Sequence, residues 1–415
     1  MRYNRTMDHT AEGSGAIPMQ SPADLSRAQE NIRAAHSADF WPSFLMAFAL
    51  TSIAIGVTWD ISWHESVGRD TFWTPAHMAI YLGGAVAGFT AGWLAIRDTF
   101  LALEANRDFS VNVFGARAPL GAWVAIWGAI AMLTAGPFDN WWHNAYGLDV
   151  KIISPPHVVL GLGMLGISVG ALLLVLSRQN RFPDSSAKGS GLYIYTGGVF
   201  VLLGSVFLLE YIYPNDQHGF MFYTVCAMMF PMRLIAIGRS ARISFPATLT
   251  AAVYMVFLCA TDWILNLFPA HPKLAPIFNP ITHMVDLPFP LLLIIPALGI
   301  DLVLYLTRNR QSWWLRIILA LVLGTVFLAI FIPVQWNFSK FLISPHAENW
   351  FFMGDRVWGY GNGRGEWWHD FWDNTSKLSM TDLLISRSML FSWVYACAGS
   401  WVGLFFGDWM RKVRR

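Results

Sequence analysis

Residues 157–177 read HVVLGLGMLGISVGALLLVLS, a run without Asp, Glu, Lys or Arg. A helix needs about 20 mainly apolar residues to cross a bilayer, and lipid offers no hydrogen-bond partner to an unpaired backbone. The run therefore predicts a membrane-spanning helix. Other mainly apolar runs of similar length lie at residues 42–59, 76–97, 118–137, 191–212, 219–238, 246–267, 284–306, 315–335 and 385–408. We predict an all-α polytopic transmembrane bundle of about ten spans.

The composition of the whole chain agrees with this prediction. Of its 415 residues, 55% are hydrophobic and only 13% are charged, and the mean hydropathy is +0.44. A soluble protein carries about twice that share of charged residues. The composition excludes a soluble enzyme, a disordered protein and a nucleic-acid-binding protein, and it makes the lipid bilayer the expected partner.

Lys and Arg gather at the two ends of the chain and in the turns that follow every second predicted span. Because cytoplasmic loops carry the excess of these residues, we expect both termini in the cytoplasm and the chain in a bacterial inner (cytoplasmic) membrane. Four regions follow: a cytoplasmic N-terminal tail (1–40), the transmembrane bundle (41–335), an outer-side loop (336–384), and the last span with a cytoplasmic basic tail (385–415).

The turn between the first two predicted spans reads WDISWHESVGRDTFWTPAH over residues 59–77. Asp60 and His64 are four residues apart, which places them on one helix face, and His77 begins the next helix. Two antiparallel helices would bring one carboxylate and two imidazoles together at the outer membrane boundary. Such a ligand set suits copper, zinc or non-haem iron, with coordination positions left open.

A second turn of the same kind reads FDNWWHNAYGLDVKIISPPH over residues 138–157. Asp139 and His143 again stand four residues apart, and His157 begins the next helix. The recurrence predicts an internal repeat of two helical hairpins, 41–98 and 118–178, and a second metal site. Two arrangements are open: each hairpin holds its own metal, or the four histidines pool around one or two metals in a dinuclear site.

Weaker candidates surround these motifs. A residue beside a ligand can orient it through a hydrogen bond. In addition, the predicted spans 246–267 and 284–306 form a third helical pair with the same topology as the first two, but without the same spacing of Asp and His. The weaker candidates, which would orient a ligand or form a further ligand set, are Arg69, Asp70, Asp149, His271, His283 and Asp286.

The first motif also carries a family resemblance. Residues 60–77 resemble the metal-ligand motif of the C subunit of the copper membrane monooxygenases, the particulate methane and ammonia monooxygenases. The resemblance rests on Asp60, Trp63, His64, Arg69, Asp70, Thr71, Thr74, Pro75 and His77 at fixed spacing. It covers the motif and not the rest of the chain. It implies that Asp60, His64 and His77 bind a metal, usually assigned as copper, at a site linked to oxygen activation.

Two functions follow as hypotheses. The first is a metal-binding integral membrane oxidoreductase, monooxygenase-like, that acts on a small or lipophilic substrate at the outer membrane boundary. The second is a non-catalytic metal-binding subunit of a larger membrane complex. Either function implies partners: other membrane subunits or a second copy of the chain, and quinol or another electron donor.

Two further readings have less support. A metal transporter would need ligands at the middle of the spans, and none of the predicted spans carries such a chain of ligands. Haem ligation by paired histidines stays open, although histidines at helix ends beside Asp fit a small metal ion better.

Overall fold

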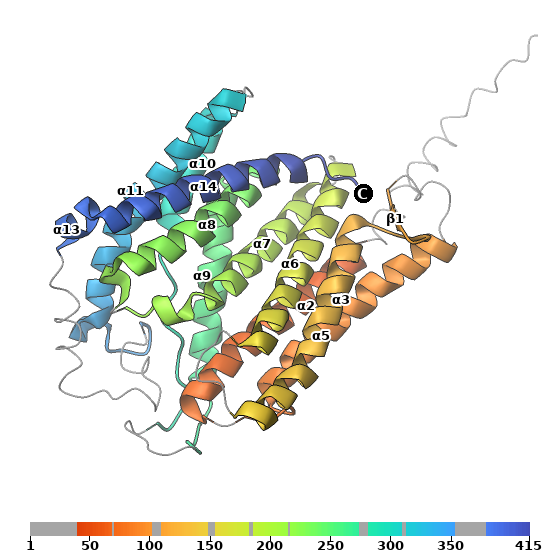
Figure 1. Ribbon diagram of the computed structural model, residues 1–415, viewed down its shortest axis with the longest axis horizontal. Helices are drawn as coiled ribbons and strands as arrows, with labels where there is room; N and C mark the ends of the chain where they lie inside the picture. Colours follow the sequence, from red (N-terminus) through yellow and green to blue (C-terminus); the bar gives the residue numbers. More distant parts are fainter. Residues whose placement is uncertain are drawn as a thin grey trace, which may run out of the picture. The chain divides into compact units, whose positions relative to one another are not determined.

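The computed structural model describes residues 40–68, 70–101, 109–147, 154–181, 186–214, 216–273, 281–308, 313–352 and 379–415. Within these ranges nine helices are long and apolar enough to cross a membrane, which confirms the all-α polytopic bundle (Figure 1). They are α2 (Trp41–Ser66), α3 (Pro75–Ile96), α5 (Leu120–Tyr146), α6 (Pro155–Arg181), α7 (Ser186–Val206), α8 (Phe220–Ser240), α9 (Pro246–Leu265), α11 (Trp313–Ile343) and α14 (Arg387–Met410).

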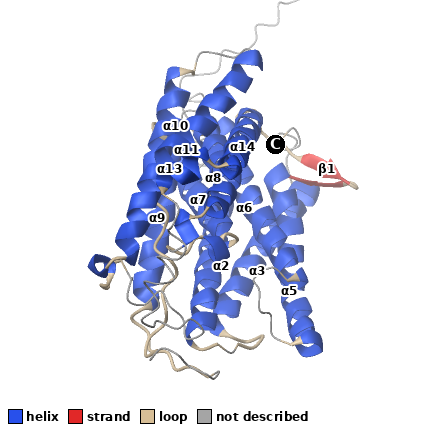
Figure 2. Cartoon of the chain, turned by 60° about the vertical axis from the view of Figure 1, so that its left-hand side comes forward, coloured by secondary structure: helices blue, strands red, loops and turns tan. Residues whose placement is uncertain are grey.

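Short elements join these helices. The strands β1 (Val111–Val113) and β2 (Ala116–Ala118) form an antiparallel pair between α3 and α5, in which Val111 faces Ala118 (Figure 2). The other short elements are η1 (Arg97–Leu101), η3 (Leu209–Tyr211), η4 (Asp216–His218), α10 (Ile294–Leu306), η5 (Pro345–Ala347) and α13 (Met380–Ile385).

The prediction of one continuous span over 284–306 is wrong. The helix in this region, α10, begins only at Ile294, and residues 284–291 are non-helical and buried. Pro288 and Pro290 explain the difference, because proline removes a backbone donor and disfavours helical geometry at the residue before it.

Side chains of other helices form hydrogen bonds with the backbone of this non-helical segment. Ser62 Oγ donates to the carbonyl oxygen of Val285 at 2.6 Å, and Ser66 Oγ accepts from the Val285 N–H at 2.7 Å. The Leu292 N–H donates to Gln335 Oε1 at 3.0 Å. Non-helical backbone at membrane depth is stable only where the protein supplies such partners.

The loop predicted at 336–384 is shorter at its start than expected, because α11 continues to Ile343. The rest of that prediction falls largely on residues 353–378, which lie outside the described residues, as does the N-terminal tail up to residue 39.

Glycines bring the helices that carry the second motif into close contact. A Cβ at Gly128 of α5 would lie 2.6 Å from the Ile167 nitrogen and 2.7 Å from the Gly163 oxygen of α6. Small residues are the usual means by which membrane helices approach so closely. α3 packs on α5 in turn, so the two motif-bearing hairpins are neighbours.

Candidate metal centres

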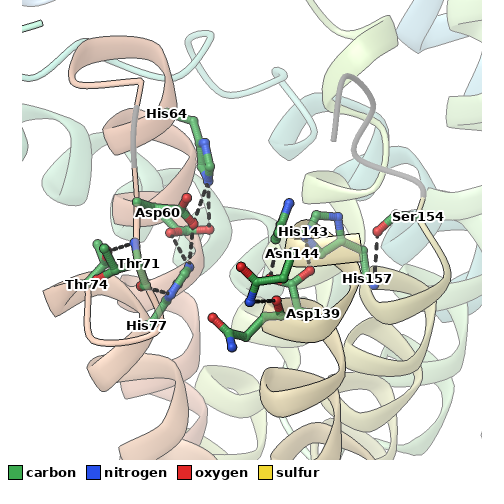
Figure 3. A network of polar contacts seen from close by, with 12 residues as sticks. Asp60, His64, Thr71, Thr74, His77, Asp139, His143, Asn144, Ser154 and His157 are labelled. Atoms are coloured by element: carbon green, nitrogen blue, oxygen red, sulfur yellow. Dashed lines mark hydrogen bonds and ion pairs between the residues drawn. The ribbon is translucent and has the colours of Figure 1, made fainter. Parts of the chain in front are cut away.

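Asp60, His64, Asp70 and His77 form the first cluster, where the C-terminal end of α2 meets the start of α3 (Figure 3). His77 Nε2 lies 3.1 Å from Asp60 Oδ1 and 3.4 Å from Asp70 Oδ2. His64 Nε2 lies 3.5 Å from Asp70 Oδ2 and 3.9 Å from Asp60 Oδ2. The His77 and Asp70 side chains are 13% and 8% exposed, whereas His64 is 45% exposed. The cluster therefore has a buried side and an open side.

The turn before α3 fixes the orientation of the His77 ring. His77 Nδ1 lies 2.9 Å from the Thr71 carbonyl oxygen, so Nδ1 carries a proton, and Nε2 is the nitrogen that faces the carboxylates of Asp60 and Asp70. The Thr71 N–H donates to Thr74 Oγ1, and the Thr74 N–H donates back to the Thr71 oxygen. Thr74 is the N-cap residue of α3, but its hydroxyl closes this turn instead of capping the helix.

Asp139, His143 and His157 form the second cluster, where α5 ends and α6 begins. His143 Nε2 lies 3.3 Å from Asp139 Oδ2, and His157 Nε2 lies 3.4 Å from Asp139 Oδ1. His143 Nδ1 faces the Gly147 carbonyl oxygen at 3.3 Å. Gly147 has φ +90°, a conformation that favours glycine, and this turn ends α5 beside the cluster.

The spacing of these atoms fits a shared metal ion. Ligands about 2.0–2.1 Å from a tetrahedral metal lie about 3.3 Å from one another, close to most of the distances in both clusters. Asp60 Oδ1 and Asp139 Oδ1 are buried and form no hydrogen bond with proper geometry, although an imidazole nitrogen stands close to each. Oxygen and nitrogen atoms at these separations can share one metal ion.

Electrostatics favours a cation at the first cluster. Two carboxylates, Asp60 and Asp70, approach the same imidazole, and no Lys or Arg among the described residues forms an ion pair with either. Ionised carboxylates near a bilayer are costly unless they are paired or bind a cation. A divalent metal would balance both charges.

The two clusters lie side by side, on neighbouring hairpins (Figure 3). They are close enough for Asp60 to interact electrostatically with His157, and Asp139 with His77. Tyr81, one turn after His77, is close enough to interact electrostatically with carboxylates of both clusters. A Cβ at Gly136 of α5 would lie 2.8 Å from the Tyr81 hydroxyl, so this glycine makes room for it.

The structure separates the predicted ligands into groups. Among the described residues, two groups have three or more metal-ligating atoms within 4.8 Å of one another: Asp60 with Asp70 and His77, and Asp139 with His143 and His157. His64 adjoins the first group. This geometry favours one site per hairpin over four pooled histidines.

The weaker candidates have different outcomes. Asp70, expected to orient a ligand, lies among the ligands themselves. His271 and His283 are exposed, and Asp286 is buried and accepts a hydrogen bond from Asn266 at 2.6 Å, so these three form no metal-ligand group in the described part of the chain. Arg69 and Asp149 lie outside the described residues.

Sequence reasoning missed Tyr81. Its only signal was its position four residues after His77, which places both side chains on one face of α3. Its proximity to both clusters depends on the contact between α3 and α5, which the spacing of the motifs does not reveal.

No protein-family model, curated protein or solved structure matches this chain. The membrane-spanning helices and the two clusters are therefore the features of this chain that bear on its function.

Proposed function

We propose that the protein is an integral membrane oxidoreductase with two copper centres, monooxygenase-like, that acts on a small or lipophilic substrate. One observation carries the proposal: imidazole Nε2 atoms converge on carboxylates at 3.1–3.5 Å in two adjacent clusters. Asp60, His64, Asp70 and His77 would hold the first metal, and Asp139, His143 and His157 the second.

The donor set and the family resemblance support copper together. Neutral imidazoles are good ligands for copper, zinc and iron, and two histidines with one carboxylate leave coordination positions open. The resemblance of residues 60–77 to the copper membrane monooxygenases selects copper among these metals. When bound, copper would supply oxygen activation, with electrons from quinol or another donor.

The protein's own residues would prepare the site. Hydrogen bonds from Nδ1 of His77 to the Thr71 oxygen, and from Nδ1 of His143 to the Gly147 oxygen, would orient each ring so that Nε2, once deprotonated, can bind a metal. The partly exposed His64 marks the open side of the first cluster, where a substrate would approach.

Aromatic side chains around the clusters support a lipophilic substrate. Trp73, Trp141 and Tyr146 are 73%, 54% and 68% exposed, beside the two turns that carry the ligands. Such side chains lie at the boundary between lipid and water, where they also provide an apolar approach from the bilayer. We place this boundary on the outer side and regard the two hairpins as an internal repeat.

Metal analysis of the purified full-length protein tests the proposal. The protein is reconstituted with copper, zinc and iron in separate experiments, and bound metal is measured per chain. We expect about two copper ions in the wild type and about one in Asp60→Asn or in Asp139→Asn. The matched control is His283→Gln, which changes an exposed histidine outside both clusters and should retain both ions.

Activity separates the two hypotheses. The copper-loaded protein is given a quinol, oxygen and a short-chain hydrocarbon, and hydroxylated product is measured. Product that requires Asp60 supports the oxidoreductase. If the protein binds copper but consumes no oxygen when assayed in its natural membrane, it is a non-catalytic metal-binding subunit. Zinc retained in preference to copper when both metals are supplied together, or no metal after reconstitution, would refute the copper centres.

A further inference from the structure

A cavity of about 260 Å³ lies between α8, α10, α11 and α14, away from both clusters. Its polar residues come from helix ends: Arg239 is in the last turn of α8, Arg316 in the first turn of α11, and Asp408 in the last turn of α14. Thr307, directly after α10, completes this polar end. Four helix ends meeting at one level indicate a position at a membrane–water boundary.

This boundary is opposite to the one that holds the clusters. His157 is in the first turn of α6, whereas Asn180, near the other end of α6, donates hydrogen bonds to the Met410 and Val413 oxygens at the end of α14. α6 has 27 residues and is therefore about 40 Å long. The cavity beside Asp408 is thus separated from the clusters by about the thickness of the membrane.

The polar end of the cavity carries a net positive charge. Arg239 Nε lies 2.8 Å from Asp408 Oδ1, and Arg316 Nη2 lies 3.4 Å from Asp408 Oδ2. One carboxylate is thus shared by two guanidinium groups. The Arg316 side chain is 43% exposed, and Asp408 is its one polar partner among the described residues. The Arg316 Nε atom is buried, so the N–H donors of the two Nη atoms that do not face Asp408 are the ones offered to an anion.

The walls of the cavity are apolar and face outwards. Leu306, Ile318 and Val322 line it and are 70%, 55% and 42% exposed on the surface of the bundle. Trp314 and Trp409, exposed at the same helix ends, are placed as interfacial aromatic residues. An occupant would meet cationic groups at one end and hydrocarbon along its length.

We propose that this cavity binds an acidic glycerophospholipid, with its phosphate on Arg316 and an acyl chain along Ile318 and Val322. Guanidinium groups recognise phosphate oxygens through two parallel hydrogen bonds, and basic pockets between membrane helices are typical lipid headgroup sites. The single excess positive charge matches a headgroup whose phosphate is not neutralised by a choline or an amine.

Lipid titration of the full-length protein tests this site. The protein is delipidated in non-ionic detergent, and its Tm and lipid-bound mass are followed with dioleoylphosphatidylglycerol, dioleoylphosphatidylcholine or inorganic phosphate. We expect phosphatidylglycerol to bind about tenfold more tightly than phosphatidylcholine, the effect of one charge-assisted hydrogen bond. Arg316→Gln should abolish this preference, whereas Arg411→Gln, an exposed basic residue outside the cavity, should retain it.

A second variant tests the same site if Arg316→Gln fails to fold. Val322→Trp fills the apolar wall from a lipid-facing position and leaves Arg316 intact, and it should lower the affinity for phosphatidylglycerol to the same degree. Equal binding of both lipids, or an unchanged preference in Arg316→Gln, would overturn the proposal. If inorganic phosphate alone raises the Tm, the cavity is a site for a free anion, and this result would also overturn the proposal.

Discussion

Replacing Gly128 with alanine tests whether the α5–α6 contact holds the second cluster in place. The new Cβ would lie 2.6 Å from the Ile167 nitrogen, where an ordinary contact needs 3.4 Å or more, so the helices would have to separate by about 0.8 Å. The obstacle is backbone, which cannot rotate away as a side chain can. Overpacking of this kind costs about 1–3 kcal/mol, and we expect the upper part of that range.

The matched control is Gly92→Ala in α3, where an added Cβ meets no atom within 4 Å. Alanine favours a helix over glycine by about 0.5–1 kcal/mol, so this variant should gain stability. Gly128→Ala has the same gain and loses about 3 kcal/mol to the clash. The two variants should therefore differ by roughly 3 kcal/mol in free energy of unfolding. Chemical unfolding in detergent micelles, followed by tryptophan fluorescence, measures this difference.

Metal content gives a second measurement on the same variant. Metal–ligand distances tolerate deviations of about 0.2 Å, so a helix separation several times larger should weaken the second site, which joins α5 to α6. The first site joins α2 to α3 and should be retained. Gly128→Ala that is as stable as Gly92→Ala would refute the reasoning from the glycine contact, whatever its metal content.

Three further outcomes are expected. Asp139→Asn should lower bound copper from about two ions to about one per chain by elemental analysis, and an unchanged value would exclude this carboxylate as a ligand. Asp70→Asn should weaken metal binding at the first cluster by about 10–100-fold in a chelator competition, because a carboxylate at this position either binds the metal or orients a ligand. Burial lowers the pKa of His218 to about 3, below its unfolded value of 6.5, so the folded state holds it neutral. Protonation then favours unfolding, and stability should fall as the pH drops from 6.5 towards 3, by up to about 1.4 kcal/mol per pH unit. Burial also raises the pKa of Asp216 to about 6, so protonation of this carboxylate makes the folded state more stable as the pH falls. The effect of His218 is therefore measured as the difference between wild type and His218→Asn in free energy of unfolding at pH 7 and pH 5.

The fold was largely predictable because membrane-spanning helices can be recognised in a sequence by their length and apolar composition. Nine of the ten predicted spans correspond to long apolar helices in the described residues. The tenth failed at Pro288 and Pro290, where hydropathy continues but helical geometry does not. Ser62, Ser66 and Gln335 supply the missing backbone partners there. Hydropathy cannot foresee such partners, because they come from helices distant in the sequence.

The candidate sites were predictable to the extent that they are local. Asp60 with His64, and Asp139 with His143, are set by helical spacing alone, and a short turn brings the next histidine back. The position of Asp70 among the ligands depends on the path of that turn, which spacing leaves undefined. The adjacency of the two clusters and the place of Tyr81 depend on the packing of α3 on α5.

Both clusters occupy the same kind of position, where one helix ends and the next begins, and this position favours a metal in two ways. The C-terminal end of a helix carries partial negative charge, which adds to the carboxylates of Asp60 and Asp139 in attracting a cation. The turns also supply backbone carbonyl oxygens, from Thr71 and Gly147, that accept from histidine Nδ1 atoms and set their tautomers. Both effects are lost if the paired helices shift relative to each other. The close glycine contacts between paired helices are therefore part of the proposed metal chemistry, since ligand atoms on two helices keep metal-binding distances only while those helices stay in register.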